Sequence, residues 1–357
     1  MERMRISMQY LNTAAYVNRL DERYKPQYEI TKLDLNHTDW HSWRTDFRSK
    51  LAKLTGLSDM QSQFSAVPLQ VRAVSREERS DYTIEKLFVT AEPGVEIPFY
   101  LLLPLGKGEG CYPLVLTPHG HGPRGKETYV GHYADEADRA ENEAGERDIA
   151  LQAVKAGYAA IAMDVRGFAE MGRRQEWEQN KGSSCLELQR ISLLYGRTLI
   201  GERVFDIGRL IDYAATRPEI DTSRIAITGN SGGGTVSLFA AALDERITVC
   251  APSSYFCTFR DSIMAMHHCS CNYIPGILQL GEMYDVAALV APRPLLLING
   301  KDDMIFPIEA AKEAFSYVHA VYAAQGAADR CRQFVGHEGH RYYKEPVWPF
   351  MKQYLSR

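Results

Sequence analysis

The stretch Arg224-Ile-Ala-Ile-Thr-Gly-Asn-Ser-Gly-Gly-Gly-Thr235 decides the fold that we expect for this chain. It begins as a short strand, passes through Gly229-Asn-Ser231-Gly-Gly233, and continues at once as a helix-forming segment over residues 235–243. The pattern is G-x-S-x-G between a strand and a helix. Such a turn places its central residue in a strained backbone conformation, and the two glycines leave room for the neighbouring backbone. The sequence therefore predicts that the Ser231 hydroxyl is exposed at the carboxyl end of a strand.

Two alternatives for this segment are a glycine-rich loop without chemistry and a phosphate-binding loop. Gly229 and Gly234 have the spacing of a phosphate-binding loop, but Thr235 occupies the position that requires lysine. The N–H of Gly232 would lie at a helix N-terminus, where positive partial charge can stabilise an oxyanion. We therefore favour Ser231 as a nucleophile and Gly232 as one oxyanion donor.

Short apolar runs separated by helical patterns surround this segment and favour a mostly parallel α/β sheet. Uninterrupted apolar runs are what a sheet buried on both faces requires. Pro93-Gly94 predicts a turn between two antiparallel strands at the start of that sheet. The expected strands are residues 82–90, 95–103, 114–117, 159–164, 224–228, 247–251, 295–299 and 331–335, and the expected helices are 147–157, 203–216, 233–243 and 308–325.

Residues 1–80 look mainly helical and are expected to form an N-terminal extension packed on a catalytic domain of residues 81–357. Apolar residues recur at helical spacing at Trp43, Phe47, Leu51, Leu54 and Leu57. Gly56 lies where this helix should stop. Because an apolar stripe needs a partner surface, we expect it to cover part of the main body.

A serine hydroxyl needs a base, and the base needs an orienting carboxylate. After a G-x-S-x-G turn these partners come later in the chain, the acid first. The loop Gly300-Lys-Asp-Asp-Met-Ile-Phe-Pro307 offers Asp302 and Asp303. We favour Asp303 because G-x-x-D-x-x-x-P matches the usual acid loop, which leaves Asp302 as an exposed loop residue.

The base comes from the loop after the last expected strand, Gly336-His-Glu-Gly-His340. We favour His340 over His337, because Gly339 permits close approach and the aromatic Tyr342 follows. His337 is then expected to be exposed.

The loop Pro118-His-Gly-His-Gly122 follows another expected strand and should supply the second oxyanion donor, the backbone N–H of His121. The side chains of His119 and His121 are expected to hold this loop by hydrogen bonds. Residues 120–125 also satisfy G-x-G-x-x-G, but Pro123 interrupts the helix that a dinucleotide site needs, and the next strand-end acid, Asp164, comes too late. We expect no dinucleotide cofactor.

The cluster His267-His-Cys-Ser-Cys271 is expected to line or cover the pocket. We do not expect a metal there, because no second ligand pair at C-x-x-C or H-x-x-x-H spacing accompanies it and adjacent ligands rarely converge on one ion. Asp164 and Arg166 are expected to be structural ion partners. The sequence thus predicts neither a metal nor another cofactor.

Composition excludes several classes of protein. The 357 residues are 45% hydrophobic and 24% charged, which excludes wholesale disorder and a collagen-like chain. A net charge of -4 gives no basic excess for nucleic acid, and no stretch approaches the ~18 apolar residues of a membrane span. No signal peptide is apparent and the seven cysteines are odd in number, so we expect a cytoplasmic protein with reduced thiols. A homo-oligomer is compatible with the sequence.

Residues 80–357 resemble the α/β-hydrolase superfamily in the stretches PLVLTPHGHG, IAITGNSGGGT, APRPLLLINGKDDMIFP and GHEGHRYY. The likeness is closest to the acetyl xylan esterase-like branch, which is similar to dienelactone hydrolase-related proteins. It implies the α/β-hydrolase fold, Ser231 as nucleophile, Asp303 as acid, His340 as base, and oxyanion donors at the backbone of His121 and Gly232. Dienelactone hydrolases proper use a cysteine nucleophile, so the serine at position 231 favours ordinary ester cleavage.

We expect a serine hydrolase that cleaves small carboxylic esters through an acyl-enzyme, with acetylated sugars among the candidate substrates. A serine peptidase or amidase would be marked by a propeller or a large gating domain. A glucuronoyl-type esterase would be marked by a basic group placed for a carboxylate, with Arg341 as the candidate. A binding module without activity would have no reason to keep all three members of the triad.

Overall fold

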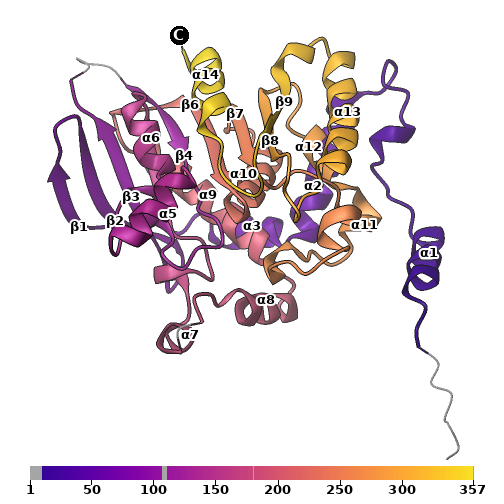
Figure 1. The fold of residues 1–357 in the computed structure, drawn as a ribbon, viewed down its shortest axis with the longest axis horizontal. Helices are drawn as coiled ribbons and strands as arrows, with labels where there is room; N and C mark the ends of the chain where they lie inside the picture. Colours follow the sequence, from indigo (N-terminus) through magenta and orange to yellow (C-terminus); the bar gives the residue numbers. More distant parts are fainter. Residues whose placement is uncertain (1–9, 107–110, 180, 357) are drawn as a thin grey trace, which may run out of the picture.

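A nine-stranded sheet forms the centre of the computed structural model, which describes residues 10–106, 111–179 and 181–356 (Figure 1). The strand order is β1-β2-β3-β5-β4-β6-β7-β8-β9. The pairings β1–β2, β2–β3 and β3–β5 are antiparallel, and every pairing from β5 through β4 to β9 is parallel. The carboxyl ends of the parallel strands therefore meet at one edge, where loops from distant parts of the sequence come together.

The strands are β1 Val71–Glu78, β2 Tyr82–Glu92, β3 Val95–Pro104, β4 Tyr112–Leu116, β5 Ala159–Met163, β6 Ile220–Asn230, β7 Val249–Ser253, β8 Leu295–Gly300 and β9 Cys331–Gly336. The α-helices are α1 Thr13–Arg23, α2 Trp40–Leu54, α3 Leu57–Phe64, α4 Lys126–Tyr129, α5 Glu136–Ala144, α6 Ile149–Lys155, α7 Arg174–Glu178, α8 Cys185–Leu194, α9 Leu199–Ala214, α10 Gly232–Leu243, α11 Ile277–Leu280, α12 Met283–Ala288, α13 Ile308–Ala324 and α14 Lys344–Leu355.

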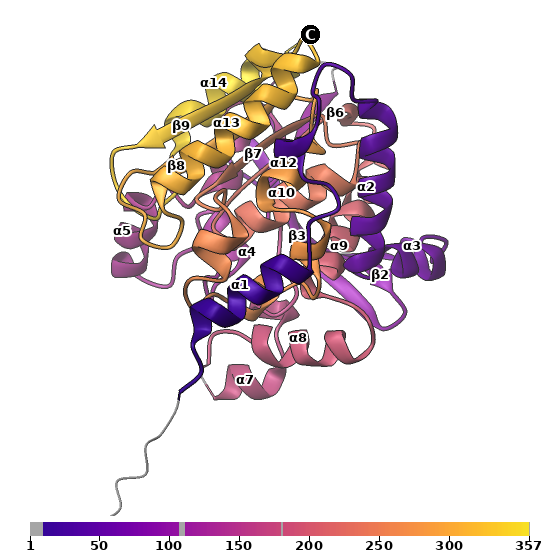
Figure 2. The same ribbon diagram turned by 90° about the vertical axis from the view of Figure 1, so that its right-hand side faces the viewer.

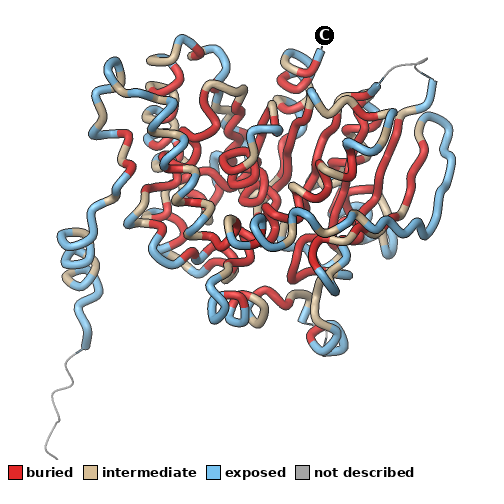
Figure 3. Tube along the Cα trace, turned by 180° about the vertical axis from the view of Figure 1, so that it is seen from behind, coloured by how far each residue is buried: buried red, intermediate tan, exposed pale blue. Residues whose placement is uncertain are grey.

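The sheet has an apolar core on each face, because successive side chains of a strand point to opposite sides. In β4, Leu114 and Leu116 join the larger core, which also contains residues of α2, α3, α9, α10, α12 and α13. Val115 between them joins the smaller core with residues of α4, α6 and α14. Figure 3 shows the resulting band of buried strands between the two helical layers. This two-sided burial explains the uninterrupted apolar runs in the sequence.

Each expected strand and helix from residue 82 onward is present, with ends shifted by a few residues. One strand was not predicted. Strand β1 lies within residues 1–80, the segment expected to be mainly helical, and it pairs with β2. All eight residues of β1 are exposed, so its sequence VRAVSREE carries no apolar alternation that would reveal a strand. The division into an N-terminal extension and a catalytic domain at residue 80 stays a prediction.

The N-terminal helices pack on the larger core as the apolar stripe indicates. Phe47 and Leu51 of α2 are fully buried, and Leu57 opens α3. Gly56 separates the two helices with a left-handed φ of 80°, which glycine adopts without strain. Helix α1, in contrast, has no buried residue and projects from the body (Figures 1 and 2).

None of the helices described is both long and apolar enough to cross a membrane.

Candidate active site

Ser231 lies on the turn between β6 and α10, as the G-x-S-x-G pattern predicts. Its φ of 56° and ψ of -116° are a strained conformation for a residue with a side chain. The backbone around it is held on both sides: the Ser231 N–H donates to the carbonyl of Ser253 at 2.9 Å, and its own carbonyl accepts from the N–H of Thr235 at 2.9 Å. The strain is therefore fixed by β7 and by the first turn of α10.

The two glycines of the pattern are required by the loop that follows β4. A Cβ at Gly229 or at Gly233 would collide with the carbonyl oxygen of Pro118. Tyr129 also fixes the serine turn, because its hydroxyl accepts a hydrogen bond from the N–H of Asn230 at 3.2 Å. Burial raises the pKa of Tyr129 to about 12, so this hydroxyl stays protonated. The serine turn and the loop after β4 are thus packed as one unit.

Asp303 and His340, which are 37 positions apart in the sequence, are in direct contact. Asp303 Oδ2 and His340 Nδ1 are 2.8 Å apart. The other oxygen of Asp303 accepts the N–H groups of Ile305 at 2.8 Å and Phe306 at 3.1 Å. The ring of Phe306 stacks on the imidazole with a centroid distance of 5.8 Å. The carboxylate is buried and both of its oxygens are engaged, so it orients the histidine firmly.

Asp302 and His337 take no part in the contact between Asp303 and His340. Asp302 is exposed, and its backbone N–H donates to the carbonyl of Glu338 at 3.1 Å. His337 is exposed and its side chain lies 3.2 Å from the carboxylate of Glu338. The geometry thus brings Asp303 and His340 together and places the other member of each pair at the surface.

A cavity of about 590 Å³ contains both Ser231 and His340 in its wall. The loop after β4 forms another part of the wall, with His119, Gly120 and His121, and Gly232 lies beside Ser231. Gly232 is the first residue of α10, so its N–H has no partner within the helix. The remaining lining residues were not singled out by the sequence; they include Arg124, Asp138, Glu141, Asn142, Arg147, Asn230, Asn272 and Ile305.

The two histidines of the loop after β4 are held in different ways. His119 Nδ1 lies 2.6 Å from the carbonyl of Gly120, and its Nε2 accepts the N–H of Val165 at 3.1 Å. Desolvation lowers the pKa of His119 to about 3, so the ring is neutral. His121 borders the open cavity, with its Nε2 3.3 Å from the sulfur of Cys271. Desolvation and the positive charge of Arg203 lower the pKa of His121 to about 4. Both rings therefore hold the loop as neutral imidazoles.

The segment after β5 is structural. Asp164 is buried and receives the ammonium of Lys126 at 2.7 Å. Arg166 makes two hydrogen bonds of 2.8 Å to Asp206 and one of 2.7 Å to Glu92. Asp164 and Arg166 thus form structural ion pairs, as expected, each with partners that the sequence did not indicate. Of the cluster at residues 267–271, His267, His268 and Cys269 line the cavity, as expected for a loop that borders the pocket.

Comparisons with known proteins identify a family and structures of the same fold. A family model described as the Abhydrolase family matches residues 1–328. A relative from Bacillus subtilis (strain 168), the proposed hydrolase YtaP, is 29% identical over 307 residues, which are 83% of this chain and 94% of YtaP. A proposed acetyl xylan esterase from Bacteroides fragilis NCTC 9343 has a TM-score of 0.79 at 17% identity, over 99% of this chain and 97% of that chain. A glucuronoyl esterase from Solibacter usitatus has a TM-score of 0.66 at 16% identity, over 93% and 99%.

Proposed function

The chain belongs to the Abhydrolase family and has the α/β-hydrolase fold, and we propose that this carboxylic ester hydrolase works through Ser231, His340 and Asp303. The observation that carries the proposal is the 2.8 Å contact of Asp303 with His340 Nδ1 beside the cavity that Ser231 also lines. With Nδ1 engaged by the carboxylate, Nε2 of His340 is the nitrogen left to take a proton. Catalytic hydrogen bonds to the nucleophile often tighten only when substrate is bound.

The reaction follows from these positions. His340 Nε2 takes the proton of the Ser231 hydroxyl while the oxygen attacks the ester carbonyl, and Asp303 stabilises the imidazolium that forms. The oxyanion of the tetrahedral intermediate lies between the N–H groups of His121 and Gly232. His340 then protonates the leaving alcohol, and water attacks the acyl-enzyme by the same route. Loss of one oxyanion donor commonly costs ~10²–10³ in rate, so the position of the loop after β4 matters as much as the triad.

We propose that the alcohol part of the substrate is a sugar. The cavity wall next to Ser231 carries polar side chains suited to hydroxyl groups, among them Asn142 and Asn230. The side-chain oxygen of Asn230 is buried and has no hydrogen-bond partner among the described residues. A buried acceptor without a partner is costly, and a substrate hydroxyl would satisfy it. The names of the structural neighbours, acetyl xylan esterase and glucuronoyl esterase, point to the same class of ester.

Between an acetyl ester and an ester of a uronic acid, we favour the acetyl ester. The carboxyl group of a uronic acid ester is uncharged until cleavage, so an arginine would serve only the carboxylate that the reaction releases. Arg341 does not line the cavity and lies 2.8 Å from Glu338. The arginines in the wall have protein carboxylates beside them, because Arg124 lies 3.2 Å from Asp138 and Arg147 lies 3.0 Å from Glu141. These protein carboxylates would compete with a released uronate. A peptidase would need a propeller or a large gating domain, and the described residues form a single sheet with its covering helices.

An ester panel tests the proposal. We expect turnover of p-nitrophenyl acetate and of acetylated xylo-oligosaccharides, and no turnover of either by Ser231→Ala with an unchanged melting temperature. Asn230→Ala should lower kcat/KM for the acetylated sugar by about five- to tenfold, the value of one hydrogen bond, and leave p-nitrophenyl acetate unaffected. Turnover by Ser231→Ala would contradict the mechanism, and equal loss on both substrates would contradict the role of Asn230.

A further inference from the structure

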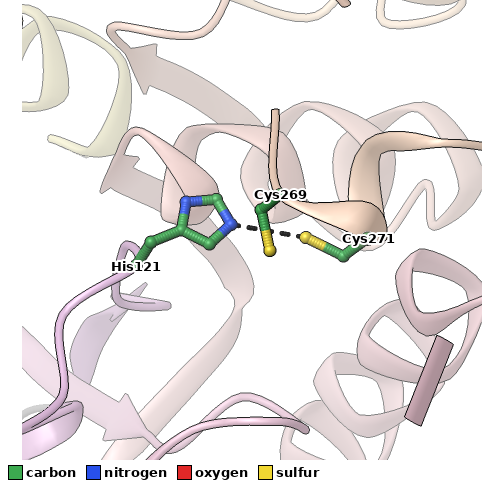
Figure 4. Close-up of side chains that lie close together, drawn as sticks. All are labelled: His121, Cys269 and Cys271. Carbon is green, nitrogen blue, oxygen red and sulfur yellow. Dashed lines mark hydrogen bonds between the residues drawn. The ribbon is translucent and has the colours of Figure 1, made fainter. Parts of the chain in front are cut away.

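A cluster of sulfur and imidazole side chains lies at the cavity wall, which His121 and Cys269 help to line. His121 Nε2 and the sulfurs of Cys269 and Cys271 all lie within 4.8 Å of one another. Figure 4 shows the three side chains pointing toward one point, from two separate loops. A fourth thiol, that of Cys185 at the start of α8, is a neighbour of both cysteines and accepts a hydrogen bond from Arg203 at 3.0 Å. All four groups are ligands that zinc prefers.

The sequence alone does not reveal this cluster, because its members come from three separate segments of the chain. The local argument against a metal considered only residues 267–271, and its two histidines indeed play no part: His268 Nε2 lies 3.1 Å from the hydroxyl of Ser262 instead. The fold supplies His121 from the loop after β4 and Cys185 from α8. Cys269 and Cys271 lie on either side of Ser270. Cys269 directly precedes the single turn Ser270–Asn272, and Cys271 lies within it.

The distances suit a tetrahedral ion. Bonds of about 2.3 Å to sulfur and 2.0 Å to nitrogen place the ligand atoms of a zinc site about 3.5–3.8 Å apart. Among His121, Cys269 and Cys271, the separation of His121 Nε2 from Cys271 Sγ is 3.3 Å and the other two pairs are within 4.8 Å. Cys185 lies outside this close group of three. Small side-chain rotations would bring these atoms to the ideal spacing.

A buried arginine lies beside this cluster without a carboxylate partner. Arg203 is 1% exposed, and none of the described carboxylates lies within ion-pair distance of it. Its guanidinium donates to the carbonyl of Arg166 at 2.6 Å and to the sulfur of Cys185 at 3.0 Å. A buried cation needs an anionic partner. Three thiolates and a neutral imidazole around one Zn²⁺ would carry a net charge of -1 and would supply that partner.

We propose that His121, Cys269 and Cys271 bind a zinc ion, with the neighbouring thiol of Cys185 as the fourth ligand. The imidazole of His121 would bind through Nε2, the nitrogen that lies 3.3 Å from the sulfur of Cys271. Thiols bind zinc as thiolates, so binding of the ion releases thiol protons to solvent.

Zinc at this place would fix the loop after β4. The ring of His121 also packs over the start of α10, where a Cβ on Gly232 would lie 2.6 Å from it. The ion would tie this loop to the segment around Cys271 and to α8. Any effect on turnover rests on the proposed function, because the backbone of His121 is the proposed oxyanion donor; the binding itself does not.

Metal analysis of the whole chain tests the site. The protein is reduced, stripped with a chelator, loaded with zinc and desalted, and the metal is counted. We expect one zinc per chain and the release of protons on binding, measured by calorimetry in buffers of different ionisation enthalpy. Cobalt in place of zinc should give the near-ultraviolet absorption of thiolate ligation. The loaded protein should also melt at a higher temperature than the stripped protein.

Single cysteine variants locate the ion. Cys269→Ser and Cys271→Ser should each bind zinc at least about 100-fold more weakly, more than the loss of an outer-shell partner costs. Cys111→Ser, at an exposed cysteine, and Cys331→Ser, at a buried cysteine of β9, should bind zinc like the parent. Circular dichroism of the stripped variants checks their folding. If one variant does not fold, the cobalt spectrum of the parent still tests whether thiolates bind the metal.

Three results would overturn the proposal. The first is a reduced parent protein that takes up no zinc or cobalt. The second is equal zinc binding by the parent, Cys269→Ser and Cys271→Ser. The third is a protein that binds no metal when reduced but loses two of these thiols to a disulfide on mild oxidation, which would make the cluster a redox site. Loss of esterase activity with zinc still bound would count only against the proposed function.

Discussion

At the scale of single residues, Asp303 differs from its neighbour in what its oxygens contact. One oxygen accepts two backbone N–H groups and the other lies 2.8 Å from His340, whereas Asp302 is exposed. We predict that Asp303→Asn lowers kcat by about 10⁴-fold, because an amide favours the wrong tautomer of the histidine. Asp302→Asn, the matched control, should change kcat less than twofold. The measurement is kcat on p-nitrophenyl acetate, and the opposite order of the two variants would contradict the assignment.

The sequence predicted the members of the proposed triad because their signals are local. A nucleophile turn, an acid loop and a histidine loop each follow a strand, and the order of these loops is fixed by the topology. The partners of Arg203 and the thiol cluster could not be predicted in this way. Four side chains from three distant segments form that cluster, and no spacing rule links Cys185 or His121 to Cys271.

At the scale of elements, the loop after β4 offers two glycines that differ in the space around them. A Cβ on Gly120 would lie 2.7 Å from the carbonyl oxygen of Asn230 and 3.5 Å from the Cβ of Ser231, whereas a Cβ on Gly122 would meet nothing within 4 Å. We predict that Gly120→Ala pushes this loop off the serine turn and lowers kcat by about 10²-fold, the cost of losing one oxyanion donor. Gly122→Ala should keep near-normal kcat. Equal behaviour of the two variants would show that the loop does not position the donor.

His119 gives this loop a dependence on pH. The folded state holds its ring neutral with a pKa of about 3, while the unfolded chain has the ordinary value of 6.5. Between these values the unfolded state binds more protons, so the free energy of unfolding falls as the pH drops below 6.5, by about 1.4 kcal/mol per pH unit. The charged neighbours Arg203 and Lys126 act in the same direction.

The prediction compares urea denaturation of the parent and of His119→Gln from pH 7 to pH 4. As the pH falls, the free energy of unfolding of the parent should drop more steeply than that of His119→Gln, by about 1.4 kcal/mol per pH unit, which is the slope for one bound proton. His119→Gln should have a lower free energy of unfolding at pH 7, and this free energy should change less below pH 7. Parallel curves would mean that His119 is not buried in its neutral form.

Among the strands, those in the middle of the sheet were the most predictable, and the edge strand β1 was not predicted. Strands β4 to β8 contain apolar runs such as Leu-Leu-Leu-Ile, because both of their faces are covered. Strand β1 is fully exposed and rich in charge, so nothing in VRAVSREE separates it from a polar helix or loop. Its pairing with β2 depends on backbone hydrogen bonds that side-chain patterns do not record.

At the scale of the whole molecule, the first described segment, α1, has little contact with the body. Helix α1 has no buried residue, and its ion pair, Asp21 with Arg260 at 2.6 Å, is partly exposed. The first firm anchors are the N–H groups of Gln27 and Tyr28, which donate to the carbonyls of Gln279 and Leu280. We predict that deletion through Tyr24 lowers the melting temperature by less than about 3 °C, the value of an exposed ion pair.

A longer deletion is the control. Removal through Leu33 also takes away the anchors and the buried Tyr28 and Ile30, and it should lower the melting temperature several-fold more. If both deletions destabilise equally, α1 has a stabilising partner, and size-exclusion chromatography of the two proteins would show whether that partner is a second copy of the chain.

The central claim is that Ser231 becomes acylated with the help of His340. The most direct measurement is mass spectrometry after treatment with a fluorophosphonate, which traps an activated serine. The account predicts a single adduct at Ser231 in the parent, none in Ser231→Ala, and labelling slowed at least about 10³-fold in His340→Gln. An adduct at another residue, or labelling of Ser231 at an undiminished rate without the histidine, would contradict it.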